Sequence, residues 1–151
     1  MSERDDLWSS IGLLILRVGI GGFLMTHGWG KLQMMIDGQY DQFGDPIGLG
    51  PGPSLVLVMI AELICALLVL IGLGTRFVTA PIIFMMGVAA FVVHGGDPWT
   101  MGEGARLFMT GEGESWASRE PALLFLIVFL ALTFTGAGRF SIDALIRARA
   151  A

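Results

Sequence analysis

Charged residues are scarce in this sequence and missing from long stretches of it. Asp, Glu, Lys and Arg make up 15% of the 151 residues, whereas a soluble domain carries about a quarter. Residues 77–93 and 121–138 have none, residues 9–26 have only Arg17, and residues 54–75 have only Glu62. Because about 20 apolar residues of helix cross the hydrocarbon core of a bilayer, this scarcity excludes an ordinary soluble domain and indicates an integral membrane protein.

Cysteine and the common catalytic motifs are also nearly or wholly missing. Cys65 is the single cysteine, so no disulfide can form within the chain, and we expect Cys65 to be a small packing residue. No HExxH, phosphate-binding loop, GxGxxG or hydrolase nucleophile motif is present. The acidic start, MSERDDLW, is unlike a cleaved signal peptide, and the scattered lysines and arginines predict no nucleic-acid surface.

Four long apolar segments dominate what is present. They cover about residues 9–29, 54–74, 77–94 and 120–138 and predict an all-α membrane protein with a four-transmembrane-helix bundle. The first and third segments end in FLMTHG and FVVHGG, and the second and fourth end in LIGLGTRF and TFTGAGRF. These matched ends predict two related helical hairpins. We expect residues 1–151 to form a single membrane domain.

The distribution of basic residues predicts the orientation. Arg4, Arg76, Arg139, Arg147 and Arg149 lie in the short segments on one side, and Lys31, Arg106 and Arg119 lie in longer loops on the other. The positive-inside rule therefore predicts both termini in the cytoplasm, in a bacterial-type inner membrane. The aromatic loop of residues 95–120 then faces outward, and we expect it to lie on the membrane surface and partly cover the bundle.

Arg17 and Glu62 are the ionisable residues in the middle of predicted spans. A charge at the bilayer centre costs at least about 2.5–3.5 kcal/mol, so each needs a partner within the bundle. Helix rise places Arg17 about 15 Å below His27 and Glu62 about 12 Å below Ser54, and we expect the two side chains to pair. This pair either only fixes helix register or lines a polar cavity in which Glu62 exchanges protons.

A second group of polar residues lies near the predicted outer edge. It comprises His27, Trp29, Lys31, His94 and Glu120. Histidines at matching ends of two spans could hydrogen-bond the carbonyls of a quinone and exchange its protons, ligate haem, or bind copper together with methionines. Their position at the rim favours quinone over haem, and the nine methionines of so apolar a chain are better explained by packing than by a copper relay. We therefore predict no protein-held metal.

With these residues identified, the chain resembles the DoxX-like family of small four-helix membrane proteins over about residues 11–146. The resemblance is carried by Arg17 before a glycine-rich helix, HGWGKL, GDPIGLGPGPSLVL, AELICALLVLIGLGTRF, FVVHGGDPW and REPALLFLIVFLALTFTGAGRFSIDALI. It implies a relation to the small membrane subunit of thiosulfate:quinone oxidoreductase. The residues that it carries over are Arg17, His27, Lys31, Glu62, His94 and Glu120. The acidic, aromatic loop of residues 95–120 departs from the family pattern.

Two functional hypotheses follow. In the first, the chain is a subunit of a quinone-linked oxidoreductase system that needs a partner protein as electron donor. Glu62, His27 and His94 are then the candidate catalytic residues, and Arg17, Lys31, Glu120 and Trp29 are candidate ligand-binding residues. In the second, the chain is a non-enzymatic membrane scaffold or a carrier of a lipid or small molecule, working as a homo-oligomer or with a protein partner.

Overall fold

The computed structural model describes residues 3–150, whose regular secondary structure is helical, with no β-strand among them. The α-helices are α1 (Glu3–Ile36), α2 (Pro51–Met59), α3 (Ala66–Ile71), α4 (Thr75–Val88), α5 (Met101–Thr110), α6 (Glu120–Thr135) and α7 (Ile142–Ala150). A short 3₁₀ turn, η1, covers Tyr40–Gln42, and two π-helical segments cover Ile60–Cys65 (η2) and Ala89–Val93 (η3). The predicted all-α class is confirmed.

Three continuous helical stretches are long and apolar enough to cross a membrane. They are Asp6–Ile36, Pro51–Ile71 and Thr75–Val93. The fourth predicted span is α6, an apolar helix of 16 residues. Its length of about 24 Å falls short of a hydrocarbon core of about 30 Å. The structure therefore supports a membrane protein with several apolar helices, and the count of four spans stays a prediction.

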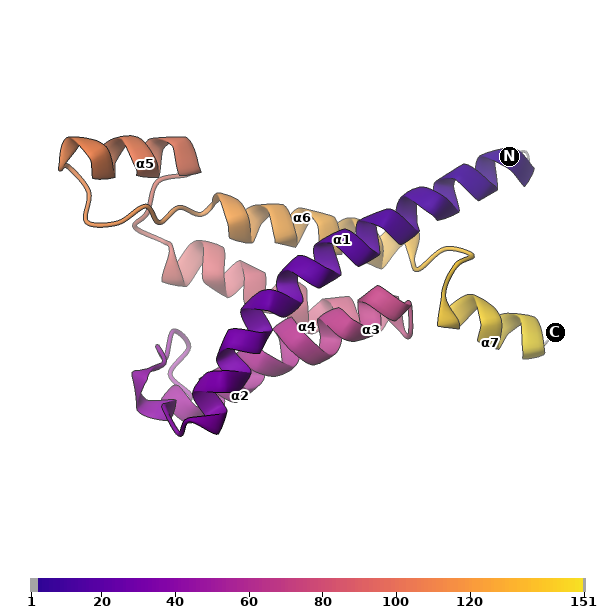
Figure 1. Ribbon diagram of the computed structural model, residues 1–151, viewed down its shortest axis with the longest axis horizontal. Helices are drawn as coiled ribbons and strands as arrows, with labels where there is room; N and C mark the ends of the chain where they lie inside the picture. Colours follow the sequence, from indigo (N-terminus) through magenta and orange to yellow (C-terminus); the bar gives the residue numbers. More distant parts are fainter. Residues whose placement is uncertain (1–2, 151) are drawn as a thin grey trace.

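The helices form an elongated assembly in which α1 crosses the others obliquely (Figure 1). Helix α1 packs against α2, η2 and α3, and α4 packs against α6. Both ends of the described chain lie at one end of the molecule, which we call the termini end. The segment between α1 and α2 and the segment with α5 lie toward the other, which we call the loop end.

The core lies where α1, α3, α4 and α6 meet. Its buried residues include Leu24, Cys65, Ala66, Val69, Ile82, Met86, Phe129 and Leu132. The burial of Cys65 agrees with its predicted packing role. Large apolar side chains outside this core are exposed on the helices, among them Ile15, Phe23, Leu57, Phe84, Phe91 and Ile127. Exposed apolar surface of this extent is what a lipid-facing surface requires.

Each of the Pro51–Ile71 and Thr75–Val93 stretches contains a π-helical segment, in the middle of the first and at the loop end of the second. The first, η2, carries Glu62, and the second, η3, ends immediately before His94. A π segment adds one residue to a helical turn and is frequent at functional sites. The space between these two segments at the loop end is therefore a candidate functional site.

Candidate functional site

A cavity of about 360 Å³ opens between the spans at the loop end. Four of its lining residues are polar: His27 and Lys31 from α1, Glu62 from η2, and His94 at the end of η3. The remaining lining residues are almost all apolar and include Leu24, Val58, Met85, Met86, Ala89, Val93, Ala122 and Phe125. A few converging polar groups within apolar walls are typical of a small-molecule site.

Glu62 pairs with Lys31, and the predicted pair of Arg17 with Glu62 is wrong. The Lys31 ammonium lies 2.7 Å from Glu62 Oε2, and the two side chains are only 19% and 9% exposed. The prediction failed because it ended the first span near residue 29. In the structure α1 continues to Ile36, so Lys31 remains on the helix, on the same face as His27 four residues before it.

Gly28 allows α1 to approach the π segment closely enough for this pair to form. A Cβ atom at this position would lie 2.7 Å from the backbone C atom of Glu62 and 2.7 Å from the backbone N atom of Leu63. Backbone atoms cannot move aside as a flexible side chain can, so any larger residue would separate the two helices. The nearby Gly30 has no atom within 4 Å of such a Cβ. Of the two glycines in HGWGKL, Gly28 is therefore the one that the packing requires.

The carboxylate of Glu62 retains capacity for a further donor. Its Oε2 atom is buried and accepts no aligned hydrogen bond, although the Lys31 ammonium is within ion-pair distance. Each carboxylate oxygen has two lone pairs. Glu62 therefore has a cationic neighbour and can accept a further hydrogen bond from a ligand in the cavity.

His94 is held in place by Asp97, a residue that the sequence analysis missed. The Nδ1 atom of His94 lies 2.7 Å from Asp97 Oδ2, and the backbone N–H of Asp97 donates to the carbonyl of His94. With the proton on Nδ1, the ring donates to Asp97 and keeps Nε2 as an acceptor. The signal in the sequence was the acid three residues after the histidine in HGGDP.

His27 lies against an aromatic wall. Its ring meets that of Phe125 edge to face, with centroids 6.1 Å apart, and Phe125 in turn stacks on Phe129. Edge-to-face contacts of this kind fix ring orientation. Phe125 is a lining residue that no polar motif could have revealed, because it lies within an apolar run of α6.

Arg17 lies outside this cavity and is fully buried toward the termini end. Its Nη1 atom donates to the carbonyls of Val69 and Leu70, at 3.4 and 3.3 Å, and its Nη2 donates to the carbonyl of Phe140. The last carbonyls of a helix have no partner within it, and a cation there is favourable. Arg17 thus joins α1 to the end of α3 and to the segment before α7.

Trp29 and Glu120 also lie outside the cavity lining. Trp29 is 55% exposed on α1. Glu120 begins α6, and its Oε2 accepts a hydrogen bond of 2.7 Å from the backbone N–H of Met101. The structure therefore brings together His27, Lys31, Glu62 and His94, and separates them from Arg17, Trp29 and Glu120.

The segment before α2 closes one side of the cavity through Phe43, Gly44 and Pro46. Asp45 holds this segment in place, because its carboxylate accepts hydrogen bonds from Leu49 N, Gly50 N and Ser54 Oγ at 2.8–2.9 Å. The bond from Gly50 is the main cause of the lowered pKa of Asp45, and burial acts against it. Asp45 thus anchors the loop to the start of α2.

The segment that follows η3 is anchored by Arg119. Its guanidinium donates to the carbonyls of Gly95 and Asp97 and stacks over the ring of Trp99, with Cζ 4.7 Å from the centroid. These contacts fix the turn that carries Asp97, and through it the orientation of His94. Within residues 6–150, no cluster of three or more His, Cys, Asp or Glu side chains could hold a metal ion.

The family model for DoxX proteins matches residues 12–95, which is more than half of the chain. The chain belongs to the DoxX family. The matched region of this DoxX protein contains all four polar residues of the cavity, whereas Glu120, α6 and α7 lie beyond it. No curated protein and no solved structure matches the chain.

Proposed function

We propose that this DoxX protein is a membrane subunit of a quinone-linked oxidoreductase system and that the loop-end cavity binds a quinone or a similar small ligand. The observation that carries the proposal is the convergence of His27, Lys31, Glu62 and His94 in one cavity with apolar walls. A volume of about 360 Å³ lies within the ordinary range for small-molecule sites.

The chemistry of the polar groups fits a ligand with carbonyl oxygens. The Lys31 ammonium has donors beyond its contact with Glu62, and each histidine can donate or accept a hydrogen bond near neutral pH. A bound quinone would supply two-electron chemistry coupled to protons. The protein would orient the carbonyls, exclude water, and hold protons at Glu62 and at the ring nitrogens of the histidines.

An apolar cavity beside the site fits a lipid-soluble tail. It has a volume of about 180 Å³, lies between α2 and α4, and shares Pro46, Val58, Met85 and Val88 with the polar cavity. Its other lining includes Leu57 and Phe84, both exposed on the outer surface of the helices. A ligand whose polar head meets Glu62 could therefore extend an apolar tail toward the bilayer.

The proposal also includes an inner-membrane location with both termini in the cytoplasm. Arg76, Arg139, Arg147 and Arg149 all belong to segments at the termini end, which supports this orientation. The two ends of the described chain lie at the same end of the molecule, which supports an even number of crossings. In this proposal helix α6, which returns the chain from the loop end, is the fourth span.

Mass spectrometry of co-purifying lipids tests the ligand. Protein purified in mild detergent should retain a quinone, and Glu62→Gln should lose most of it. Glu120→Gln is the matched control, because this carboxylate lies at the same end of the bundle but outside the cavity. Absence of quinone from the wild-type protein would count against the proposal. Retention of another lipid that depends on Glu62 would instead favour the carrier function.

A further inference from the structure

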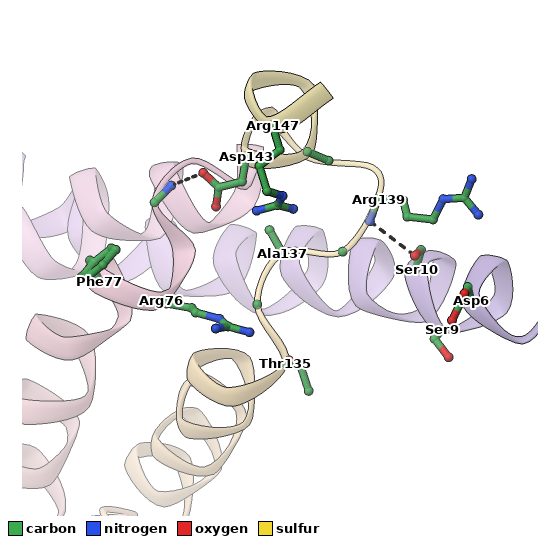
Figure 2. A pocket seen from close by; sticks show the side chains of 14 residues that line it. Asp6, Ser9, Ser10, Arg76, Phe77, Thr135, Ala137, Arg139, Asp143 and Arg147 are labelled. Carbon is green, nitrogen blue, oxygen red and sulfur yellow. Dashed lines mark hydrogen bonds between the residues drawn. The ribbon is translucent and has the colours of Figure 1, made fainter. Parts of the chain in front are cut away.

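A second cavity of about 780 Å³ lies at the termini end, far along the bundle from the polar site. It is formed by the start of α1, the start of α4, the turn that follows α6, and α7 (Figure 2). Arg76, Arg139 and Arg147 contribute three guanidinium groups to its lining, and Asp6 and Asp143 contribute two carboxylates. The quinone proposal assigns no role to this cavity.

Two of the arginines approach the same turn from different helices. Arg76 extends from α4 and Arg147 from α7, and both side chains point toward the turn around Ala137, whereas Arg139 points away along α1 (Figure 2). Arg76 Nη2 donates to the carbonyl of Phe134 at 3.2 Å. Among the side chains of residues 6–150, none of the three arginines has a carboxylate within 4.0 Å. Within residues 6–150 no carboxylate therefore competes with an anion for these charges.

The acids of the cavity do not cancel this charge. Asp143 accepts hydrogen bonds from Gly74 N at 2.8 Å and from Thr75 N at 3.3 Å, so its carboxylate caps the start of α4. A carboxylate at the start of a helix is already compensated by the partial positive charge there. Asp6 is then the other acid among the lining residues, which include three arginines, and the cavity is cationic on balance.

The turn after α6 is shaped to leave room for Arg76. Gly136 has a φ of 75°, which favours glycine, and a Cβ there would lie 3.3 Å from Arg76 Nε. Gly138 also has a φ of 75°. The turn can therefore fold back over the guanidinium without blocking it.

Exposed aromatic residues adjoin these charges. Phe77 lines the cavity and is 83% exposed, and Phe134, whose carbonyl holds Arg76, is 74% exposed. Arg76 is the second residue of the apolar stretch Thr75–Val93, so it stands where a span meets the headgroup region. We propose that this cavity binds the phosphate of an anionic phospholipid, with Arg76 and Arg147 on the headgroup and the aromatic residues along the acyl chains.

Binding of short-chain phosphatidylglycerol, compared with phosphatidylcholine of the same chain length, tests this proposal by native mass spectrometry of the full chain in detergent. Phosphatidylglycerol should bind more tightly to the wild-type protein. Arg76→Gln and Arg147→Gln should each weaken its binding roughly fivefold, equivalent to about 1 kcal/mol. The Arg76→Lys variant, which keeps the charge but loses the planar fork, should fall between the two.

Arg149→Gln is the matched control, because Arg149 lies on α7 but not in the cavity. Equal binding of the two lipids to the wild-type protein would overturn the proposal without any variant. So would an equal loss in Arg149→Gln, since it would mean general surface charge. Inorganic phosphate serves as a separate probe. If it alone binds as tightly as phosphatidylglycerol, the site takes free phosphate and the lipid assignment is wrong.

Discussion

At the scale of single residues, the Lys31–Glu62 pair provides the charged groups of the otherwise apolar loop-end cavity. Both side chains are mostly buried and lie on helices that face lipid on their other sides. Such a pair is costly to form and far more costly to break, because removing one member leaves an uncompensated buried charge. The pair therefore supplies both a donor and an ionisable group inside an otherwise apolar space.

A double-mutant cycle on this pair tests that description. Lys31→Met alone should lower the free energy of unfolding by about 3 kcal/mol, because Glu62 is left buried without its cation. Adding Glu62→Leu should recover most of the loss. Denaturant unfolding in detergent micelles provides the measurement. Additive losses in the double variant would show that the two residues do not interact.

The Asp45 carboxylate predicts a pH dependence at the loop end. Its folded pKa lies below its ordinary value of about 3.9, so its stabilising effect is complete above that value and is lost as the pH falls through the folded pKa. The wild-type protein should therefore lose stability between pH 4 and its folded pKa, and Asp45→Asn should flatten that part of the profile. Thermal unfolding at a series of pH values is the measurement. An unchanged profile in Asp45→Asn would contradict the assignment.

Many residues of the site could be predicted from their types and positions in the sequence. The residues with which their side chains pair could not. An ionisable residue within a long apolar stretch pointed to Glu62, and paired His-Gly sequences pointed to His27 and His94, which lie on one cavity. The partner of Arg17 could not be predicted, because its hydrogen bonds go to backbone carbonyls that every residue possesses. Depth estimates failed as well, since they depended on where α1 ends.

At the scale of elements, the crossing of α1 over η2 depends on one glycine. The helix continues through Gly28, where its backbone approaches the π segment, and then delivers Lys31 to Glu62. In the matched sequences LIGLGTRF and TFTGAGRF, Gly72, Gly74, Gly136 and Gly138 all have positive φ, but Gly72 is left-handed helical with ψ 42° whereas Gly136 has ψ −165°. The predicted relation of the two hairpins therefore stays a prediction. At the loop end the likeness is weaker, because His27 lies within α1 whereas His94 follows η3.

Substitution of the two glycines in HGWGKL tests the crossing. Gly28→Ala should destabilise the protein by at least about 1–3 kcal/mol through overpacking against backbone, and it should weaken ligand binding at the cavity. Gly30→Ala has open space around the new methyl group and should be neutral or stabilising by up to about 1 kcal/mol. Equal losses in both variants would indicate a helix-wide effect rather than a close contact at Gly28.

At the scale of the whole molecule, both ends of the described chain lie at the termini end. We therefore expect a residue at the loop end and a residue at the termini end to be accessible from opposite sides of the membrane. In a Cys65→Ala background, Glu114→Cys at the loop end should react with a membrane-impermeant maleimide in intact cells. Arg149→Cys at the termini end should react only after permeabilisation. This is the expected result for four spans with cytoplasmic termini. Labelling of both positions from one side would mean that α6 does not cross the membrane.

The overall class could be predicted because segments without charged residues make up about half the chain and are best explained as membrane helices. The lengths of the helices could not be predicted. A run of apolar residues does not mark where a helix stops, so α1 extends beyond its predicted bounds and α6 is shorter than expected. The π segments were equally hidden, since their sequences, IAELIC and AAFVV, resemble ordinary apolar helix. They nevertheless adjoin the site on two sides.

The central claim is that the loop-end cavity binds a quinone. The most direct test is to titrate the protein in detergent with a short-tailed quinone and to measure its thermal stability at each concentration. The wild-type protein should be stabilised in a saturable manner, and Glu120→Gln should behave in the same way. Glu62→Gln and His94→Ala should each weaken the apparent affinity at least about tenfold, because each loses a hydrogen bond within a buried site. Absence of any quinone-dependent stabilisation of the wild-type protein, or equal affinity in the Glu62→Gln variant, would contradict the account.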